Sequence, residues 1–276
     1  MHWTFAALSA ALAATVAQAA TAEPAEPLWE IGIGAFGVSQ QAYPGADQQV
    51  NRGIALPYAL YRGEVLRVDR GGAGLRAVKQ PAFELDIGVA GAFGARSDDI
   101  EARRGMPDLG TLVEFGPRLV WRLDGGTPTP GAGRWRVELP LRGVFDLSDD
   151  LHHRGMSFEP ELQYARRSSG GWSYSASAGL VFADRRLART FYAVDPVDAT
   201  AERPAYASRA GLLATRLGLT VSRSLSADWR LFGFARMDSV TGAANRDSPL
   251  VRRTTGGSVG IGVAWTWLRS ERPAAD

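Results

Sequence analysis

Residues 258–267 read Ser-Val-Gly-Ile-Gly-Val-Ala-Trp-Thr-Trp, and their alternation decides the fold. Hydrophobic or aromatic side chains occupy every second position from Val259 to Trp267, while the positions between them hold only Ser, Gly, Ala and Thr. A period of two is typical of a β-strand with one apolar and one polar face.

Other stretches of the chain repeat this pattern, namely 83–93, 111–121, 135–141, 156–164 and 172–182. Most run for about ten residues, which is the length that a tilted strand needs to cross a bilayer. Tryptophans lie near the ends of these stretches, as expected of side chains at a membrane–water interface. The pattern predicts an all-β fold, an antiparallel transmembrane β-barrel of about twelve strands.

The lengths of the connections support this prediction. We expect strands at 28–39, 53–61, 64–70, 73–79, 83–94, 110–122, 134–145, 155–166, 172–182, 210–223, 228–239 and 256–267. If both chain ends are periplasmic, the outward connections are long and the inward ones short, with exceptions at 71–72 and 123–133. Outer-membrane barrels show this asymmetry.

Four prolines interrupt the expected strands: Pro57, Pro117, Pro140 and Pro160. Proline has no N–H to donate to a strand ladder, and a closed barrel has no free edge to accommodate it. We therefore expect bulges or local breaks in pairing at these positions.

The N-terminus resembles a secretory signal peptide. Residues 5–17 form a short uncharged apolar run, followed by the cleavage-type sequence Ala17-Gln18-Ala19. We expect a signal peptide at 1–19 and one outer-membrane domain at 20–276, with the barrel at about 28–267 and a tail at 268–276.

Composition excludes several classes of protein. The chain of 276 residues is 45% hydrophobic and contains no cysteine, which excludes disordered chains, disulfide scaffolds and cysteine-based metal sites. The net charge is +2 and the arginines are spread along the chain, so no nucleic-acid partner is expected. We expect no cofactor and no metal.

Several short stretches resemble the MipA/OmpV family of outer-membrane proteins in order and spacing. They are YPGAD (43–47), LPYALYRG (56–63), FGPRL (115–119), LPLRGVF (139–145), GMSFEPEL (155–162), FYAV (191–194), YASRAG (206–211) and DSPLV (247–251). The resemblance marks Tyr43, Pro44, Gly45, Asp47, Asp247, Ser248 and Pro249 as outer-loop motif residues. It implies an outer-membrane barrel, and one family member is described as a scaffold between a lytic transglycosylase and a penicillin-binding murein synthase. The tail after Trp267 departs from the family, whose barrels tend to end on an aromatic residue.

Charged residues recur on the polar faces of the expected strands. The acidic ones are Glu84, Asp86, Glu114, Glu138, Glu159 and Glu161, and the basic ones are Arg118, Arg122, Arg136, Arg142 and Arg216. Unpaired charges are costly in a narrow barrel, so we expect a network of ion pairs in the lumen. Same-face carboxylates such as Glu84 and Asp86 can also act as an acid–base pair, and this alternative is the weaker one.

Two further sequence patterns suggest a catalytic or a ligand-binding site. His152 and His153 are candidates for the base of a rim lipid hydrolase, although adjacent residues of an extended chain should point to opposite sides. Residues 32–37 match G-x-G-x-x-G, but no helix is expected after them, so close packing explains these glycines better than nucleotide binding.

Three functions remain open from the sequence. The first is a non-enzymatic scaffold whose partner would grip 125–133, 20–27 or 268–276. The second is a small-solute channel, for which loops 40–52 and 183–209 are natural plugs. The third is the rim lipid hydrolase.

Overall fold

The computed structural model describes residues 27–62, 66–69, 72–92, 94–125, 132–168 and 170–274. The expected signal peptide, 1–19, lies outside this range. Within it, no helix has the length and apolar character that a membrane crossing requires.

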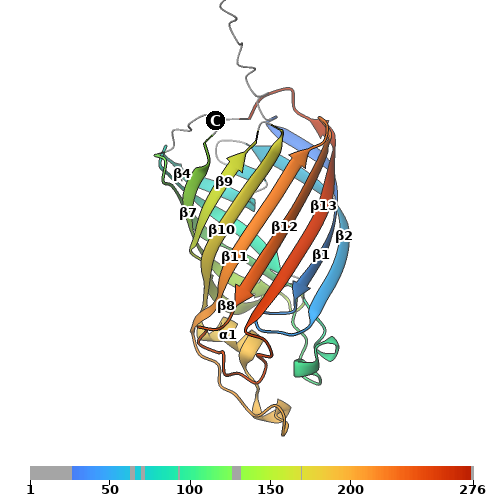
Figure 1. Ribbon diagram of the computed structural model, residues 1–276, viewed down its shortest axis with the longest axis vertical. Helices are drawn as coiled ribbons and strands as arrows, with labels where there is room; N and C mark the ends of the chain where they lie inside the picture. Colours follow the sequence, from blue (N-terminus) through green and yellow to red (C-terminus); the bar gives the residue numbers. More distant parts are fainter. Residues whose placement is uncertain are drawn as a thin grey trace, which may run out of the picture.

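The strands form one antiparallel sheet that closes on itself, because the last strand pairs with the first (Figure 1). The described residues contain 13 strands: β1 (Trp29–Gln41), β2 (Gln49–Arg62), β3 (Leu66–Asp69), β4 (Gly72–Lys79), β5 (Phe83–Ala92), β6 (Leu112–Arg122), β7 (Arg134–Asp146), β8 (His152–Phe158), β9 (Glu161–Arg167), β10 (Trp172–Ala183), β11 (Gly211–Ser224), β12 (Trp229–Ser239) and β13 (Thr255–Arg269). The predicted antiparallel barrel is confirmed, and β13 runs to Arg269 rather than stopping at Trp267.

The strand count differs from twelve because the stretch expected as one strand, 155–166, is two. β8 and β9 both lie between β7 and β10, and the chain breaks between them at Glu159-Pro160. Neighbouring strands bond across the break, since Glu159 N donates to the Pro140 carbonyl (3.2 Å) and Leu180 N donates to the Pro160 carbonyl (3.0 Å). The missing backbone N–H of Pro160 is thus accommodated by dividing one strand of the barrel into two.

The other prolines behave in two ways. Pro117 falls where the β6–β7 register is interrupted, between Phe115↔Gly143 and Arg118↔Pro140, as expected for a residue that cannot complete a ladder. Pro57 instead sits in regular register opposite Ile33 of β1, so the irregularity expected there is wrong on the β1 side.

The outer surface of the barrel is an apolar belt. Large hydrophobic side chains alternate with inward residues on most strands and stay exposed, among them Ile33, Phe115, Leu217, Val259 and Ile261, the last 65% exposed. Exposed tryptophans lie at one end of the strands: Trp121, Trp135, Trp229, Trp265 and Trp267. This arrangement matches a lipid-facing surface with an interfacial aromatic girdle.

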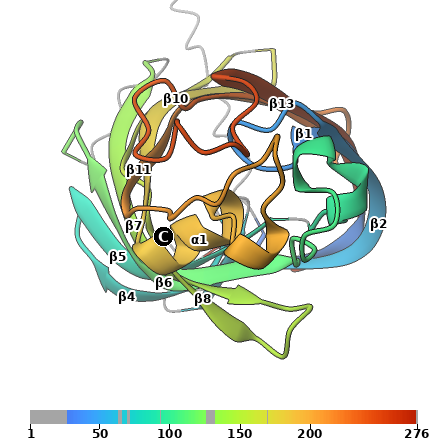
Figure 2. The same ribbon diagram turned by 90° about the horizontal axis from the view of Figure 1, so that it is seen from below.

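The two ends of the barrel differ. At the tryptophan end, here called the turn end, connections such as 80–82, 168–171 and 225–228 are short. At the other end, segments 42–48, 94–111, 147–151, 184–210 and 240–254 form what we call the cap. The cap includes α1 (Arg185–Tyr192) and the 3₁₀ turns η1 (Ser97–Asp99), η2 (Glu101–Arg103) and η3 (Pro196–Asp198). Seen from that end, α1 and the segments 184–210 and 240–254 lie largely within the outline of the ring, whereas the β7–β8 hairpin projects beyond it (Figure 2).

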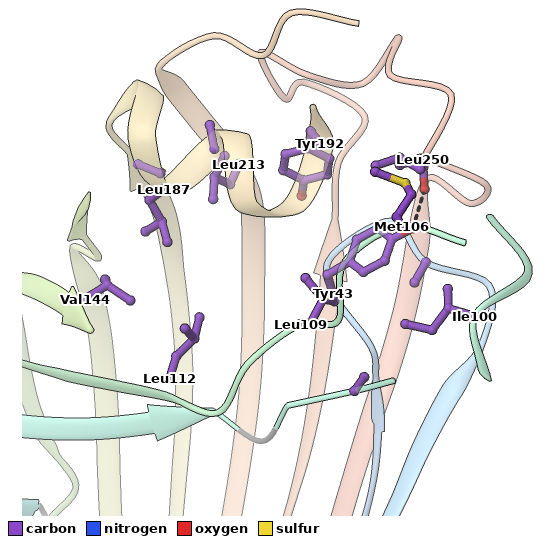
Figure 3. Close-up of a cluster of buried hydrophobic side chains, with 14 of the residues drawn as sticks. Tyr43, Ile100, Met106, Leu109, Leu112, Val144, Leu187, Tyr192, Leu213 and Leu250 are labelled. Atoms are coloured by element: carbon purple, nitrogen blue, oxygen red, sulfur yellow. Dashed lines mark hydrogen bonds between the residues drawn. The ribbon is translucent and has the colours of Figure 1, made fainter. Parts of the chain in front are cut away.

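The cap has its own hydrophobic core, which lies at the mouth of the barrel. Its buried members come from different cap segments and adjoining strand ends, and include Tyr43, Ile100, Met106, Leu109, Leu112, Val144, Leu187, Tyr192, Leu213 and Leu250 (Figure 3). Burial of such side chains stabilises the closed arrangement of loops that have no regular structure of their own.

Candidate functional site: the cap and the lumen

The cap is held together by hydrogen bonds between residues far apart in the chain. Tyr43 Oη donates to the Leu250 carbonyl (2.8 Å), Tyr192 Oη donates to the Pro44 carbonyl (2.8 Å), and Ser248 Oγ donates to the Tyr192 carbonyl (2.7 Å) (Figure 3 shows the first). We call these five residues the clasp. They join the first, fourth and fifth outer loops into one unit.

Gly45 extends the clasp through its backbone. Its carbonyl accepts from the N–H groups of Arg252 (2.8 Å) and Arg253 (3.1 Å). Its φ of +94° lies in the left-handed region that favours glycine. A β-carbon at this position would also press against Val251.

The predicted outer-loop motif residues do not all meet in the clasp. Tyr43, Pro44 and Ser248 do, and Gly45 adjoins the clasp through its carbonyl. Asp247 is instead exposed and pairs with its neighbour Arg246 (3.4 Å). Asp47 has a buried Oδ1 without a hydrogen-bond partner among the described residues, and Pro249 lies half-buried beside Ser248.

Sequence reasoning did not single out two residues that complete the cap. Tyr192 lies inside the FYAV stretch, and the stretch was the signal that pointed to it. Asn245 exchanges two bonds of 2.8 Å with the backbone N–H and carbonyl of Arg209, linking the YASRAG stretch to the segment before DSPLV.

Burial controls the ionisation of Tyr43. Desolvation raises the pKa of its hydroxyl to about 12, against the lowering effect of Arg103, whose guanidinium lies 5.9 Å from the ring centre. Burial also lowers the pKa of Arg103, which donates to Ser97 Oγ (3.2 Å) and the Pro107 carbonyl (3.1 Å). Tyr43 is therefore protonated at neutral pH and available as a donor.

The lumen carries a first group of ion pairs across β5, β6 and β7. Arg118 binds Asp86 through two bonds (3.0 and 2.6 Å) and also approaches Glu138 (3.5 Å). In the same wall Arg122 pairs with Glu84 (2.5 Å) and Arg136 with Glu138 (2.8 Å). Side chains at every second position of a strand point to the same face, and all of these residues occupy positions that face the interior.

A second group lies across the barrel. Arg216 of β11 binds Asp238 of β12 (2.8 and 3.1 Å) and Glu159 at the break between β8 and β9 (3.2 Å). Asp238, which is 5% exposed, also pairs with Arg236 (3.5 Å). Asp238 is a network member that sequence reasoning missed, although the alternation of 228–239 places it on the inward face.

The remaining predicted lumen residues make weaker contacts. Glu114 accepts from Ser157 Oγ (3.1 Å) and lies 3.7 Å from Arg142. Glu161 accepts from Gln163 (3.4 Å). Each of the eleven charged residues expected in the lumen thus takes part in at least one of these contacts.

The two histidines correct one expectation. The side chains of His152 and His153 do not point to opposite sides, because both rings contact Arg186. Arg186 Nη2 lies 3.0 Å from His152 Nε2, and Arg186 Nη1 lies 3.3 Å from His153 Nδ1. The register shift between Val144 and Phe145 disturbs the alternation at this point. A permanent cation against both rings does not make a nucleophile–base pair, and the Ser157 hydroxyl is bound to Glu114.

The glycines of 32–37 belong to β1. A β-carbon on Gly32 would collide with the Trp265 carbonyl and the Tyr58 ring, and Tyr58 Oη bonds Thr266 Oγ1 inside the barrel (2.7 Å). These glycines give room to an interior tyrosine. Among the described residues, no group of three or more His, Asp or Glu side chains is arranged to hold a metal ion.

Comparison with known proteins shows which family this barrel belongs to. A family model described as "MltA-interacting protein MipA" matches residues 31–267, which is nearly the whole barrel. The chain belongs to the MipA family. Family membership, the closed sheet and the apolar belt together identify an outer-membrane β-barrel protein.

Two solved structures illustrate what this MipA-family chain is similar to. The NanC porin has 11% identity and a TM-score of 0.42, covering 84% of this chain and 98% of that one. The translocator domain of autotransporter NalP from Neisseria meningitidis has 12% identity and a TM-score of 0.43, covering 87% of this chain and 88% of that one. No curated protein sequence matches the chain.

Proposed function

We propose that this MipA-family barrel is a non-enzymatic scaffold that holds a murein enzyme of the lytic transglycosylase class at the inner surface of the outer membrane. The carrying observation is membership of a family described as MltA-interacting. A murein synthase of the penicillin-binding class is the second partner that such a scaffold brings together.

The two ends of the barrel support this division of roles. The cap core lies at one mouth, so the free surface for a periplasmic partner is the turn end. There the two ends of the described chain lie side by side: Pro27 bridges to Pro273, and Leu28 N donates to the Arg272 carbonyl (2.8 Å). The connection 123–133 is the longest at this end.

The proposal is tested by capture of a lytic transglycosylase on the immobilised barrel. Replacing 123–133 by a two-residue turn should reduce capture strongly, and removing 270–276 should weaken it further. Asp247→Ala, at the exposed opposite end, is the matched control and should leave capture unchanged. Equal capture by all variants, with each variant folded, would contradict a scaffold that works through the turn end.

The channel alternative makes a different prediction. A capped barrel whose lumen holds paired charges should be silent in a planar bilayer, whereas a channel should conduct with the cap intact. The rim hydrolase would require His152 or His153, so undiminished lipid cleavage by a variant lacking both would remove that site.

A further inference from the structure

Among the described residues, the strands between β2 and β5 are too short to complete the wall of the barrel. Only 20 residues, 63–82, are available for the two strands and the connections between β2 and β5. A tilted transmembrane strand takes roughly 9–11 residues, but β3 has 4 and β4 has 8. β3 and β4 are therefore too short to span the full height of the barrel wall.

The strand pairing shows the same gap between β2 and β5. β2 pairs with β1 along its whole length, from Gln49 to Tyr61, whereas its described pairing with β3 is limited to Tyr61 and Arg62. Among the described residues no ladder joins β2 to β4 or β5. Within the described part of the chain, the edge of β2 from Gln49 to Ala59 that faces away from β1 has no neighbouring strand.

An unpaired strand edge at membrane depth needs a cover, because backbone polar groups are costly in hydrocarbon. The outward residues of this stretch are small and exposed: Gly53, Ala55, Pro57 and Ala59. Pro57 fits here, since proline is tolerated where a strand borders no partner. The same small residues leave room for a slender apolar chain beside β2.

A cavity of about 480 Å³ lies against the cap-side ends of the two strands that flank the gap. Its lining includes Arg52 of β2 and the segment Gly94–Arg96 that follows β5, together with Arg154 from β8. Arg154 is already paired with Asp146 (2.7 Å) and Asp149 (3.0 Å). The cavity therefore touches both sides of the gap at the level of the cap.

Two guanidinium groups in this cavity are available for an anion. Arg52 donates to the neighbouring Asn51 carbonyl (3.2 Å), and neither Arg52 nor Arg96 is in an ion pair within the described residues. The third carboxylate of the lining, Asp108, accepts a bond of 2.6 Å from the Ser97 N–H. Arginine pairs favour carboxylate and phosphate groups.

We propose that the gap between β2 and β5 is a lateral opening that admits a single-chain anionic amphiphile from the membrane. Its acyl chain lies along the free edge of β2, and its carboxylate or phosphate binds Arg52 and Arg96. This site is independent of the turn end and of the scaffold function.

The experiment uses the mature chain reconstituted in phosphatidylcholine vesicles, with dodecanoic acid carrying a mid-chain diazirine as the probe. Irradiation should label residues 49–60 and 94–96 saturably. Excess dodecanoate or dodecyl phosphate should compete, while dodecanol should compete poorly because it lacks the charge. The more effective of the two anions identifies the headgroup.

The arginines are tested with Arg52→Gln and Arg96→Gln, each expected to weaken competition by dodecanoate about tenfold, the loss typical of one charged hydrogen-bonding partner. Arg246→Gln, an exposed cap arginine outside the cavity, should change nothing. Retained heat-dependent gel mobility shows that each variant is folded.

Three results would overturn the proposal: labelling spread evenly around the belt, equal competition by dodecanol and dodecanoate, or unchanged binding by both arginine variants. A fourth concerns a different cover for the edge. The chain has no cysteine, so a disulfide-linked dimer of an Ala55→Cys variant in vesicles would show that a second copy pairs with β2 instead.

Discussion

The Tyr192 hydroxyl donates a 2.8 Å hydrogen bond to the carbonyl of Pro44, a residue 148 positions earlier in the chain. The ring of Tyr192 also meets Tyr43 edge to face, with centroids 6.2 Å apart. This pair fixes α1 to the first outer loop. The cap is therefore a lid whose loops are cross-linked to one another and packed on the strand ends below.

Replacing Tyr192 by Phe should loosen the cap without opening the barrel. The change removes one hydrogen bond and leaves the Pro44 carbonyl without its donor, at a cost of about 1 kcal/mol. Hydrogen exchange of amides in 43–48 and 187–192 should accelerate roughly fivefold, while strand amides keep their rates. Tyr206→Phe, also in the cap, is the control. Equal protection in both variants would mean that the bond contributes nothing.

The cap should loosen in alkali through Tyr43. Its folded pKa of about 12 lies above the ordinary value of 10. The resulting stabilisation is thus fully present below pH 10 and is lost as pH rises from 10 to 12. The absorbance difference at the phenolate band between wild type and Tyr43→Phe should titrate late. Titration of this hydroxyl near 10 would contradict its burial.

Arg216 should matter more to stability than any surface arginine. Arg216→Gln leaves the carboxylates of Asp238 and Glu159 without their shared partner in the interior, which typically costs about 3–5 kcal/mol. The double variant with Asp238→Asn should recover part of this loss. Urea titration of the heat-sensitive gel band measures both, and Arg246→Gln, with its exposed pair, should be within about 0.5 kcal/mol of wild type.

Gly32→Leu should prevent closure between β1 and β13. The new side chain would have to occupy the space of the Trp265 carbonyl and the Tyr58 ring. Gly53→Leu, on the free outward stretch of β2 where nothing lies within 4 Å, is the matched control. Loss of the compact gel band for the first variant and its retention for the second is the expected outcome. The reverse result would contradict the register between β1 and β13, the pair of strands that closes the barrel.

Much of the fold follows from period two. In 258–267 the alternation alone places Val259, Ile261 and Trp267 on the outer face, where they are exposed. The interruption at Pro160 was expected as a bulge or a local break in pairing. Its division of one strand into β8 and β9 was not, because Phe158, Leu162 and Tyr164 preserve the alternation across it. Whether proline bends a strand or divides it depends on what the neighbouring strands offer, and here Pro140 and Leu180 bond across the interruption.

The cap lies beyond the reach of periodicity. The loop sequences carry no repeating pattern, and the clasp joins Tyr43, Tyr192 and Ser248 through tertiary contacts alone. Family resemblance marked the right segments but not which side chains meet. The shared guanidinium of His152 and His153 was missed for a similar reason: alternation fails where the register shifts.

The seam between β1 and β13 also has a consequence for biogenesis. Glu30 is paired with Arg269, so the first and last parts of the barrel meet only after nearly the entire chain is available. Contacts of such long sequence separation form slowly. Until then β1 and β13 both have free edges and the belt is exposed to water. A polypeptide that ends before Thr255 lacks β13 and therefore cannot form the pair of strands that closes the barrel.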